Sequence, residues 1–272
     1  MNVRVGTNLH GRGGPKLASL LLSTVALVAA GPSAQAQQDD ARTILKAMSD
    51  YVSGQTTIEF TFDSDIEIIT PQLEKIQFTN SGELMLSRPD KMRGHRVGGY
   101  VDVELYFDGK TASVYGKNLN GYAQFAAQGT LDQLFEALRA GHGVSLPGAD
   151  FLLSKPYEAL IADVLEAKHI GRGVIDGIEC EHLAFRNFDT DWQVWIEVGA
   201  NPVPRKLVIT SKTINNAPQY TFRVKTWKSG FEPPAGAFTF TPPAGAVKLD
   251  PNNLILLDEL PPEAPAPTGG NQ

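Results

Sequence analysis

Cys180 and His182 lie two residues apart in the segment from Glu179 to Asn187, and their types and spacing point to chemistry more directly than any other pair. Side chains two apart in a strand share a face, so the pattern predicts a thiol beside an imidazole. A structural zinc site needs four ligands, and a catalytic zinc site needs three with an open position. The sequence holds no second pair at ligand spacing, and Cys180 is its one cysteine. We therefore expect a buried structural thiol, with no metal, no cofactor and no intramolecular disulfide.

Carboxylates form two further groups on strand faces. Asp63, Asp65 and Glu67 share one face, as do Asp102 and Glu104. Acid and base roles require a pocket that shifts the pKa of one member, and neither group is flanked by residues that predict such a pocket. The sequence also lacks a nucleophile elbow, a phosphate-binding glycine loop and a dinucleotide fingerprint. We expect these carboxylates to lie on a solvated outer face, and we expect the protein not to be an enzyme.

The stretch from Ser81 to Tyr115 predicts the strands that would position such residues. Apolar and polar residues alternate from Val101 to Phe107, which places four apolar side chains on one face. Asp108 and Gly109 follow and suit the positive backbone φ angles of a two-residue hairpin turn. The stretch therefore predicts an antiparallel meander with one apolar face.

The same stretch carries a resemblance to a known fold family. Its glycine-led strand is followed by Arg88-Pro89-Asp90-Lys91-Met92-Arg93, by Tyr106-Phe107-Asp108-Gly109-Lys110 and by Tyr115. These features resemble the periplasmic lipoprotein-carrier fold of LolA, LolB and LppX. More closely, residues Ala41 to Leu249 resemble an uncharacterised family of predicted bacterial periplasmic proteins in that fold group. The resemblance implies a carrier or binder of lipids or lipid-modified proteins. It transfers no lipid-contact residue, because the matching residues form turns.

The rest of the chain extends the meander and interrupts it with helices. Asp39 to Ser53, Leu131 to Ala140 and Pro156 to Ala167 carry apolar residues at helical spacing, the last with Leu165 facing inward. We expect 10 to 11 strands in all, and a meander of this length must curl or close to remove its edges. The predicted fold is mainly β with α: an antiparallel meander curled into an incomplete, open β-barrel covered by helices, as in LolA.

Residues 1 to 36 predict an export signal. Arg4, Arg12 and Lys16 precede an apolar run from Leu17 to Ala30, and Ala34-Gln35-Ala36 fits the small-x-small pattern of signal peptidase. The run of about 14 residues is shorter than the roughly 20 that span a bilayer. The chain has no twin arginine before the run and no cysteine at the cleavage point. We expect the general secretion route, a periplasmic protein and no stable membrane insertion after cleavage.

The mature chain is expected to hold a single domain, residues 37 to 250, and a proline-rich tail, residues 251 to 272. Leu254 to Leu257 could dock on the domain, whereas Pro261 to Gln272 has too little apolar surface to order itself. Loss of the signal leaves 21 basic and 30 acidic residues, a net charge of −9. Because the chain is acidic and its basic residues are scattered, we expect no nucleic acid partner. Separately, we expect the protein to be a monomer.

The apolar face is the remaining candidate site. Its cavity-lining candidates are Phe60, Phe62, Leu84, Leu86, Leu105, Phe107, Val194, Ile196 and Phe222. In a narrow barrel these side chains would simply fill the interior. In a wider, open barrel under a helical lid they would line a cavity for an acyl chain. The sequence predicts the alternation and leaves both arrangements open.

Two functions follow from these two arrangements. A cavity favours a periplasmic carrier of lipids or lipoproteins, the role that the resemblance implies. A filled interior favours a module that binds an envelope protein through an exposed apolar patch, as does RseB, a regulator that the chain also resembles. A hydrolase is a third alternative, and it would require a convergent polar cluster inside the cavity.

Overall fold

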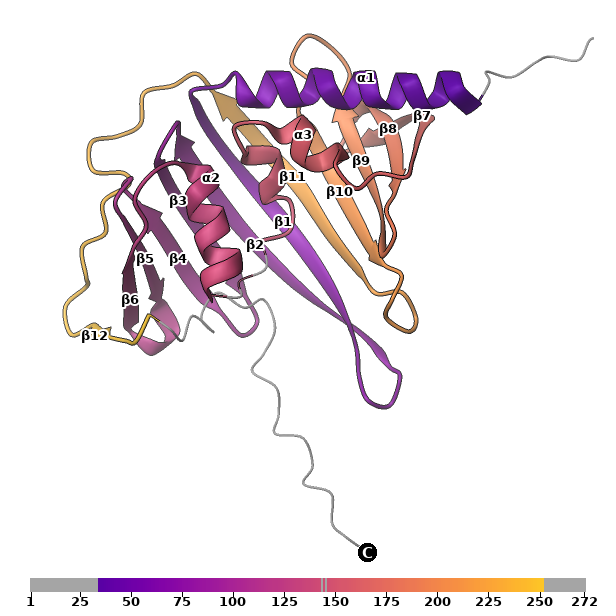
Figure 1. Cartoon of the computed structure of the whole chain (residues 1–272). Helices are drawn as coiled ribbons and strands as arrows, with labels where there is room; N and C mark the ends of the chain where they lie inside the picture. Colours follow the sequence, from indigo (N-terminus) through magenta and orange to yellow (C-terminus); the bar gives the residue numbers. More distant parts are fainter. Residues whose placement is uncertain (1–33, 143, 145, 252–272) are drawn as a thin grey trace, which may run out of the picture. The chain divides into compact units, whose positions relative to one another are not determined.

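The computed structural model describes residues 34–142, 144 and 146–251, in which one large sheet is covered by helices (Figure 1). The helices are α1 (Ala34–Ser53), α2 (Leu131–Glu136) and α3 (Pro156–Ile161), with the short helical segments η1 (Lys117–Leu119), η2 (Ala137–Gly141) and η3 (Ala149–Leu152). The strands are β1 (Thr57–Ile69), β2 (Lys75–Ser87), β3 (Lys91–Gly98), β4 (Asp102–Phe107), β5 (Thr111–Gly116), β6 (Gly121–Ala126), β7 (Glu166–Ile175), β8 (Ile178–Arg186), β9 (Thr190–Glu197), β10 (Pro204–Ser211), β11 (Gln219–Ser229) and β12 (Val247–Lys248).

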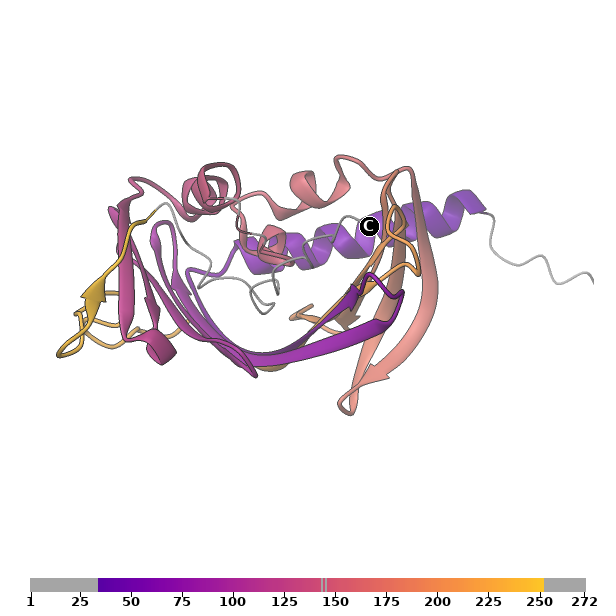
Figure 2. The same ribbon diagram turned by 90° about the horizontal axis from the view of Figure 1, so that it is seen from below.

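The sheet consists of two antiparallel meanders that meet at β1. Its strand order is β12-β6-β5-β4-β3-β2-β1-β11-β10-β9-β8-β7, and all neighbours are antiparallel except β12 and β6. Because β7 and β12 have no strand partner on their outer sides within the described residues, the sheet is an open half-barrel and not a closed one. Figure 2 shows the sheet as a curved layer with the helices over its concave side. The predicted LolA-like fold is confirmed, with twelve strands in the described residues.

Alternation along the strands gives the sheet two different faces. On the concave face, Phe60, Leu86, Phe107 and Val194 are almost completely buried. On the convex face, β1 carries Asp63, whose carboxylate accepts a hydrogen bond from Ser81 at 2.6 Å. Period-two alternation predicted this separation, and burial of the apolar set on one face is the main favourable contribution to the fold.

Helix α1 covers one part of the concave face. It begins at Ala34, five residues before the predicted start. Ala41, Leu45, Met48 and Val52 recur at helical spacing and are fully buried, because this side of α1 packs against β7 and β8. Among the described residues, no helix combines the length and apolar character needed to cross a bilayer.

Helix α3 is shorter than the sequence pattern predicted. It ends at Ile161 and not at Ala167, and Leu165 is 67% exposed instead of facing inward. The reason is strand pairing, since the Leu165 N–H donates to the Arg186 carbonyl at 2.8 Å and the chain then enters β7. The hydrogen bonds of the sheet thus override the local helical spacing.

The segment between β11 and β12 runs along the convex face without pairing as a strand. Phe240 inserts among three tyrosine rings, with centroids 5.4 Å from Tyr106, 5.9 Å from Tyr115 and 5.4 Å from Tyr122. Prolines in this segment cannot donate to a ladder, so aromatic packing and not strand pairing holds it on the sheet.

Candidate ligand-binding site

Cys180 and His182 share the convex face but do not form a reactive pair. The Cys180 thiol is fully buried, which raises its pKa to about 11, and it donates to the Ile178 carbonyl at 3.5 Å. The His182 ring stacks on Trp195 with centroids 4.1 Å apart and lies within hydrogen-bond distance of Gln193 at 2.9 Å. The described part of the chain contains no group of three or more metal-ligating side chains.

The predicted acidic groups lie in hydrogen-bond and ion-pair networks on the convex face. Burial opposes the charge of Glu104, but the Tyr106 hydroxyl and the Lys117 ammonium outweigh it and lower the pKa of Glu104. Burial and the same hydrogen bond raise the pKa of Tyr106 to about 12. Glu104 is therefore ionised and Tyr106 neutral at physiological pH, which fits a structural network on the convex face.

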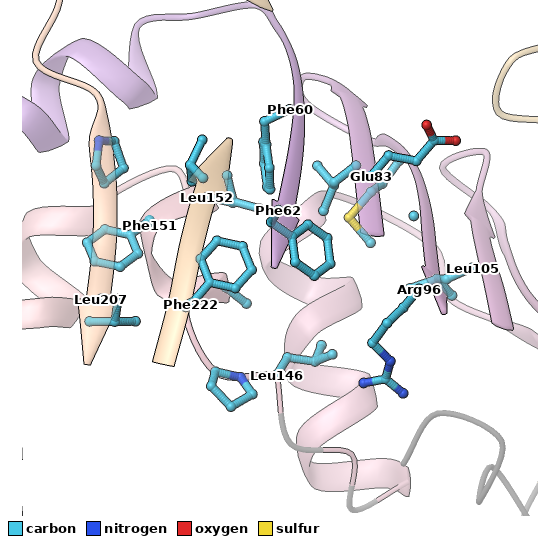
Figure 3. Close-up of a pocket in the computed structure, with 18 of the residues that line it drawn as sticks. Phe60, Phe62, Glu83, Arg96, Leu105, Leu146, Phe151, Leu152, Leu207 and Phe222 are labelled. Atoms are coloured by element: carbon cyan, nitrogen blue, oxygen red, sulfur yellow. The ribbon is translucent and has the colours of Figure 1, made fainter. Parts of the chain in front are cut away.

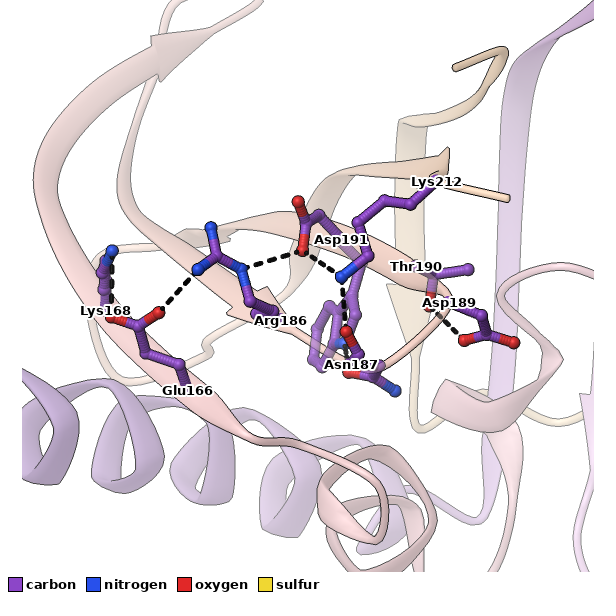
Figure 4. A network of polar contacts seen from close by, with 9 residues as sticks. Glu166, Lys168, Arg186, Asn187, Asp189, Thr190, Asp191 and Lys212 are labelled. Atoms are coloured by element: carbon purple, nitrogen blue, oxygen red, sulfur yellow. Dashed lines mark hydrogen bonds and ion pairs between the residues drawn. The ribbon is translucent and has the colours of Figure 1, made fainter. Parts of the chain in front are cut away.

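A second polar network holds the turn between β8 and β9 (Figure 4). Arg186 contacts Glu166 at 3.2 Å and Asp191 at 3.4 Å, and the Lys212 ammonium contacts the same Asp191 at 3.1 Å. The Trp192 indole donates to the Asn187 side chain at 3.1 Å. Each carboxylate drawn into this network has a basic or hydroxyl partner, so its arrangement supports a structural role.

A pocket with a volume of about 170 Å³ lies on the concave face. Its floor comes from β1 to β4, β10 and β11, and its cover comes from α2 and from residues 146–152, which include η3. Val52, near the end of α1, completes the lining. Figure 3 shows the rings of Phe62 and Phe222 side by side in the middle of this pocket. The pocket thus lies where the two meanders meet and where the cover consists of short segments.

Aromatic packing builds the centre of the pocket. Phe62 and Phe222 stack with centroids 4.7 Å apart, and Phe60 stacks on Trp227 at 5.7 Å. Gly82 permits this arrangement, because a Cβ there would lie 2.5 Å from the Phe62 ring. A larger residue at position 82 would push Phe62 out of its place.

The cover of the pocket is apolar inside and fixed by polar contacts outside. Phe135 of α2 and Phe151 of η3 face the pocket and are almost completely buried. Arg139 contacts Asp150 at 2.7 Å, which ties η2 to η3. Asp132 accepts from the Ser154 N–H at 2.9 Å, which ties the start of α2 to the chain beyond η3. These two contacts connect the separate segments of the cover to one another.

Few charged groups line this pocket. The Glu83 carboxylate points away from the aromatic rings, and Arg96 extends to the side where Leu146 lies (Figure 3). His95 pairs with Asp102 at 2.8 Å, and the Lys206 ammonium lies 4.9 Å from the Trp195 ring, so both direct their polar atoms to other partners. Arg96 therefore supplies the cationic side chain of an otherwise apolar site.

The structure separates the nine candidate residues into two groups. The pocket is lined by Phe60, Phe62, Leu84, Leu105 and Phe222. The core, away from the pocket, contains Leu86, Phe107, Val194 and Ile196, each at most 1% exposed. The binding role of the first group stays a prediction.

Several lining residues were not among the candidates. Trp227 lies directly opposite Phe60 in the β1–β11 pairing, 167 positions along the chain, a contact that no local pattern specifies. Phe151 and Leu152 lie in a segment whose glycine and proline content concealed η3. Val103 and Arg96 had usable signals, because Val103 alternates with Leu105 on β4 and Arg96 alternates with Met92 and Gly94 on β3.

Comparisons with solved structures find general similarity at low sequence identity. An uncharacterised conserved protein from Thermus thermophilus is 11% identical, with a TM-score of 0.46 over 78% of this chain and 99% of its own. The Mycobacterium tuberculosis lipoprotein LppX is 14% identical, with a TM-score of 0.45 over 71% and 98%. MucB in the Pseudomonas aeruginosa MucA/MucB complex is 13% identical, with a TM-score of 0.43 over 74% and 61%.

A search of curated protein sequences finds no match. By contrast, residues 41–250 match a protein family along almost the whole described sheet and its covering helices. This match places the protein in the periplasm, as the export signal predicted. The chain belongs to the family described as predicted periplasmic protein, DUF2092.

Proposed function

We propose that the pocket binds a hydrophobic ligand, such as the acyl chain of a lipid or of a lipid-modified protein, and that the protein carries this ligand in the periplasm. The observation that supports the proposal is a hollow site, floored by Phe62 and Phe222, on a face that is otherwise filled. Apolar concave sites with few polar groups are typical ligand sites. A carrier also requires a ligand that can leave, and a cover of short segments suits this requirement.

The size of the pocket limits what it holds in this conformation. A cavity of about 150 Å³ is known to hold benzene, so about 170 Å³ corresponds to roughly six carbon atoms. Burying six methylene groups contributes about 5 kcal/mol before the costs of binding. We therefore propose that the end of an acyl chain occupies the pocket and that the rest of the chain leaves through the open side of the pocket.

A second candidate function is an interaction module for an envelope protein. Exposed apolar residues in the turns at one end of the strands favour it. The turns after β1, β3, β8 and β10 all lie at the same end of the antiparallel strands. Leu73, Tyr100, Phe188 and Ile214 in these turns are 49–88% exposed. Several exposed apolar side chains at the same end of a sheet are typical of protein contact sites.

Native mass spectrometry of gently purified protein tests the first candidate. We expect bound fatty acid or phospholipid, and we expect Phe222→Ala to reduce the bound fraction at least fivefold. Phe240→Ala is the matched control, because it removes the same ring from the convex face. Wild-type protein that is free of lipid under all purification conditions would reject the carrier and favour the interaction module.

A further inference from the structure

We propose that the end of the sheet that carries exposed apolar turns docks on a zwitterionic lipid surface, and that the pocket exchanges its ligand there. The inference rests on the proposed carrier function, because a carrier of lipids must meet a membrane. The docking surface, here called the apolar rim, consists of Leu73, Tyr100, Leu119, Phe188 and Ile214. These side chains are 49–88% exposed.

The two ends of the antiparallel strands differ in the turns that they carry. At the rim end, the five turns β1–β2, β3–β4, β5–β6, β8–β9 and β10–β11 each contain one residue of the apolar rim. At the opposite end, the four turns contain residues 88–90, 108–110, 176–177 and 198–203, and none of these turns holds an exposed large apolar side chain. A single exposed apolar residue needs no explanation, but one in every turn of the same end indicates a contact surface.

Three neighbouring turns form the centre of the rim and are bonded to one another. The Asn216 side chain donates to the Leu73 carbonyl at 3.3 Å, which joins the β10–β11 turn to the β1–β2 hairpin. The Lys212 N–H donates to the Asp189 carbonyl at 2.8 Å, which joins the same turn to the β8–β9 turn. The three turns therefore present their apolar side chains together, at the end of the sheet where the β1–β2 hairpin projects (Figure 1).

The charge of the five turns favours a surface without net charge. The turns contain two acidic residues, Glu74 and Asp189, and two basic residues, Lys117 and Lys212. The chain as a whole is acidic, so anionic lipids would repel the rest of the protein. The rim end thus carries no net charge and needs no charged partner.

The shape of the rim favours lipids over a folded protein. Its side chains extend from separate turns and lie beside polar residues such as Gln72, Asn187 and Asn215. A protein partner would need a matching depression for each side chain, whereas a fluid bilayer accepts separate apolar groups in any arrangement. Affinity for the bilayer interface follows the apolar area that is buried in it. A few side chains therefore give a reversible contact, which a carrier requires.

The lining of the pocket extends toward the rim. Tyr220 lines the pocket and is the second residue of β11, just after the turn that carries Ile214. It lies opposite Ile66 of β1, and the half-buried Ile68 follows Ile66 on the same face toward Leu73. Docking of the rim would therefore bring this end of the pocket close to the lipids.

Flotation with phosphatidylcholine vesicles tests the docking surface. The mature wild type should float with the vesicles in 0.1 M and in 1 M sodium chloride, because salt screens charges and not apolar contacts. The variant Leu73→Ser, Phe188→Ser, Ile214→Ser should lower the partition coefficient at least tenfold. A wild type that does not float would overturn the proposal and leave the rim to a protein partner. Flotation that is lost in 1 M salt would overturn it in favour of contact through charges.

A matched control removes three exposed apolar side chains from other parts of the sheet. Ile170, Val174 and Val247 are 54–67% exposed and lie on β7 and β12. Replacing all three with Ser should leave flotation at the level of the wild type. Equal urea midpoints for the three proteins would show that the fold is intact. Equal flotation of the rim variant and the wild type, or an equal loss in rim variant and control, would overturn the proposal.

A second test places a reporter at each end of the sheet. In a Cys180→Ala background, the fluorophore NBD on Phe188→Cys should shift to shorter wavelength when vesicles are added. NBD on Asn201→Cys, in a turn at the opposite end, should not shift, and equal shifts would overturn the orientation. Lipid that copurifies is measured on the same preparations. Flotation without copurified lipid would support docking and reject the carrier, whereas copurified lipid without flotation would support the carrier and reject docking.

Discussion

The concave face contains two regions that are built from the same alternation and covered in different ways. Beside α1, Leu183, Val194 and Ile196 are at most 1% exposed and belong to a filled core. Around the junction of the two meanders, Phe62 and Phe222 remain half-buried and line a pocket. Strand alternation therefore specifies which side chains face inward, whereas the covering element decides whether the space between them is filled.

The covering elements differ in length and regularity. Helix α1 is 20 residues long and presents the fully buried Ala41, Leu45 and Met48 to the filled region, whereas Val52 near its end lines the pocket. The pocket is covered by α2, which continues directly into η2 so that the two together form 11 helical residues, by residues 146–148 and by the four-residue η3. Short pieces present fewer side chains in fixed rotamers, so they leave space that a long amphipathic helix would occupy.

A charge placed in each region should give the largest difference. We expect Val194→Glu to lower the free energy of unfolding by more than about 4 kcal/mol, because its carboxylate would be buried without a partner. Phe222→Glu should lower it by about 1 to 2 kcal/mol, since its carboxylate can reach water in the pocket. Urea denaturation followed by circular dichroism measures both. Similar losses for the two variants would mean that the pocket is part of an ordinary core.

Truncation of one ring of the filled core and of one ring of the pocket should give smaller losses of stability, with a loss of ligand binding in the pocket variant alone. Phe107→Ala should cost about 3 to 5 kcal/mol, because Phe107 is fully buried, and should leave ligand binding unchanged. Phe222→Ala should cost about 1 to 2 kcal/mol and reduce ligand binding at least fivefold. Denaturation and native mass spectrometry on the same samples measure the two effects. A folded Phe107→Ala protein that has lost its ligand would contradict the separation of the filled core from the pocket.

The sequence predicted the fold well because local signals determine it. Alternation defined most strands, and Asp108-Gly109 marked a hairpin that the structure contains. The parallel pairing of Val247–Lys248 with β6 was missed, since two residues carry no periodicity. The end of α3 was missed because pairing with β8 decided it.

The sequence predicted the sheet face on which the pocket lies, but it did not predict which residues of that face line the pocket. Phe60 and Trp227 meet through a pairing between β1 and β11, and no local pattern states which strands of two meanders become neighbours. Leu86 and Leu84 occupy the same strand and the same face, yet only Leu84 lines the pocket. The difference depends on what lies above each side chain, and that information comes from other parts of the chain.

The buried thiol on the convex face should give the stability a pH dependence. Burial raises the pKa of Cys180 to about 11, above its value in the unfolded chain. The neutral thiol is therefore favoured in the folded state, and its contribution is complete below the unfolded pKa and is lost as pH rises toward the folded pKa. We expect about 1 to 2 kcal/mol less stability at pH 11 than at pH 8, and a smaller loss in Cys180→Ala.

Thiol reactivity supplies the control for this prediction. At pH 8 the folded protein should react with a disulfide reagent only as fast as it unfolds, because the thiol is buried and neutral. Urea above the unfolding midpoint should make the reaction complete within the mixing time. Rapid reaction of folded protein would show that this part of the sheet is open.

The smallest expected effect concerns the helix that fills the core. Signal cleavage after Ala36 would shorten α1 to begin at Gln37, and Asp39 and Asp40 would then lie in its first turn. Carboxylates there interact favourably with the helix dipole, so in exported protein whose mass shows Gln37 at the start, Asp39→Asn with Asp40→Asn should lower stability by about 0.3 to 1 kcal/mol. Asp163→Asn, at an exposed position outside any helix, is the control and should have no effect. Because the interaction is screened by salt, the difference should shrink in 1 M salt, and a difference that persists there would assign the effect to packing of α1 and not to its dipole.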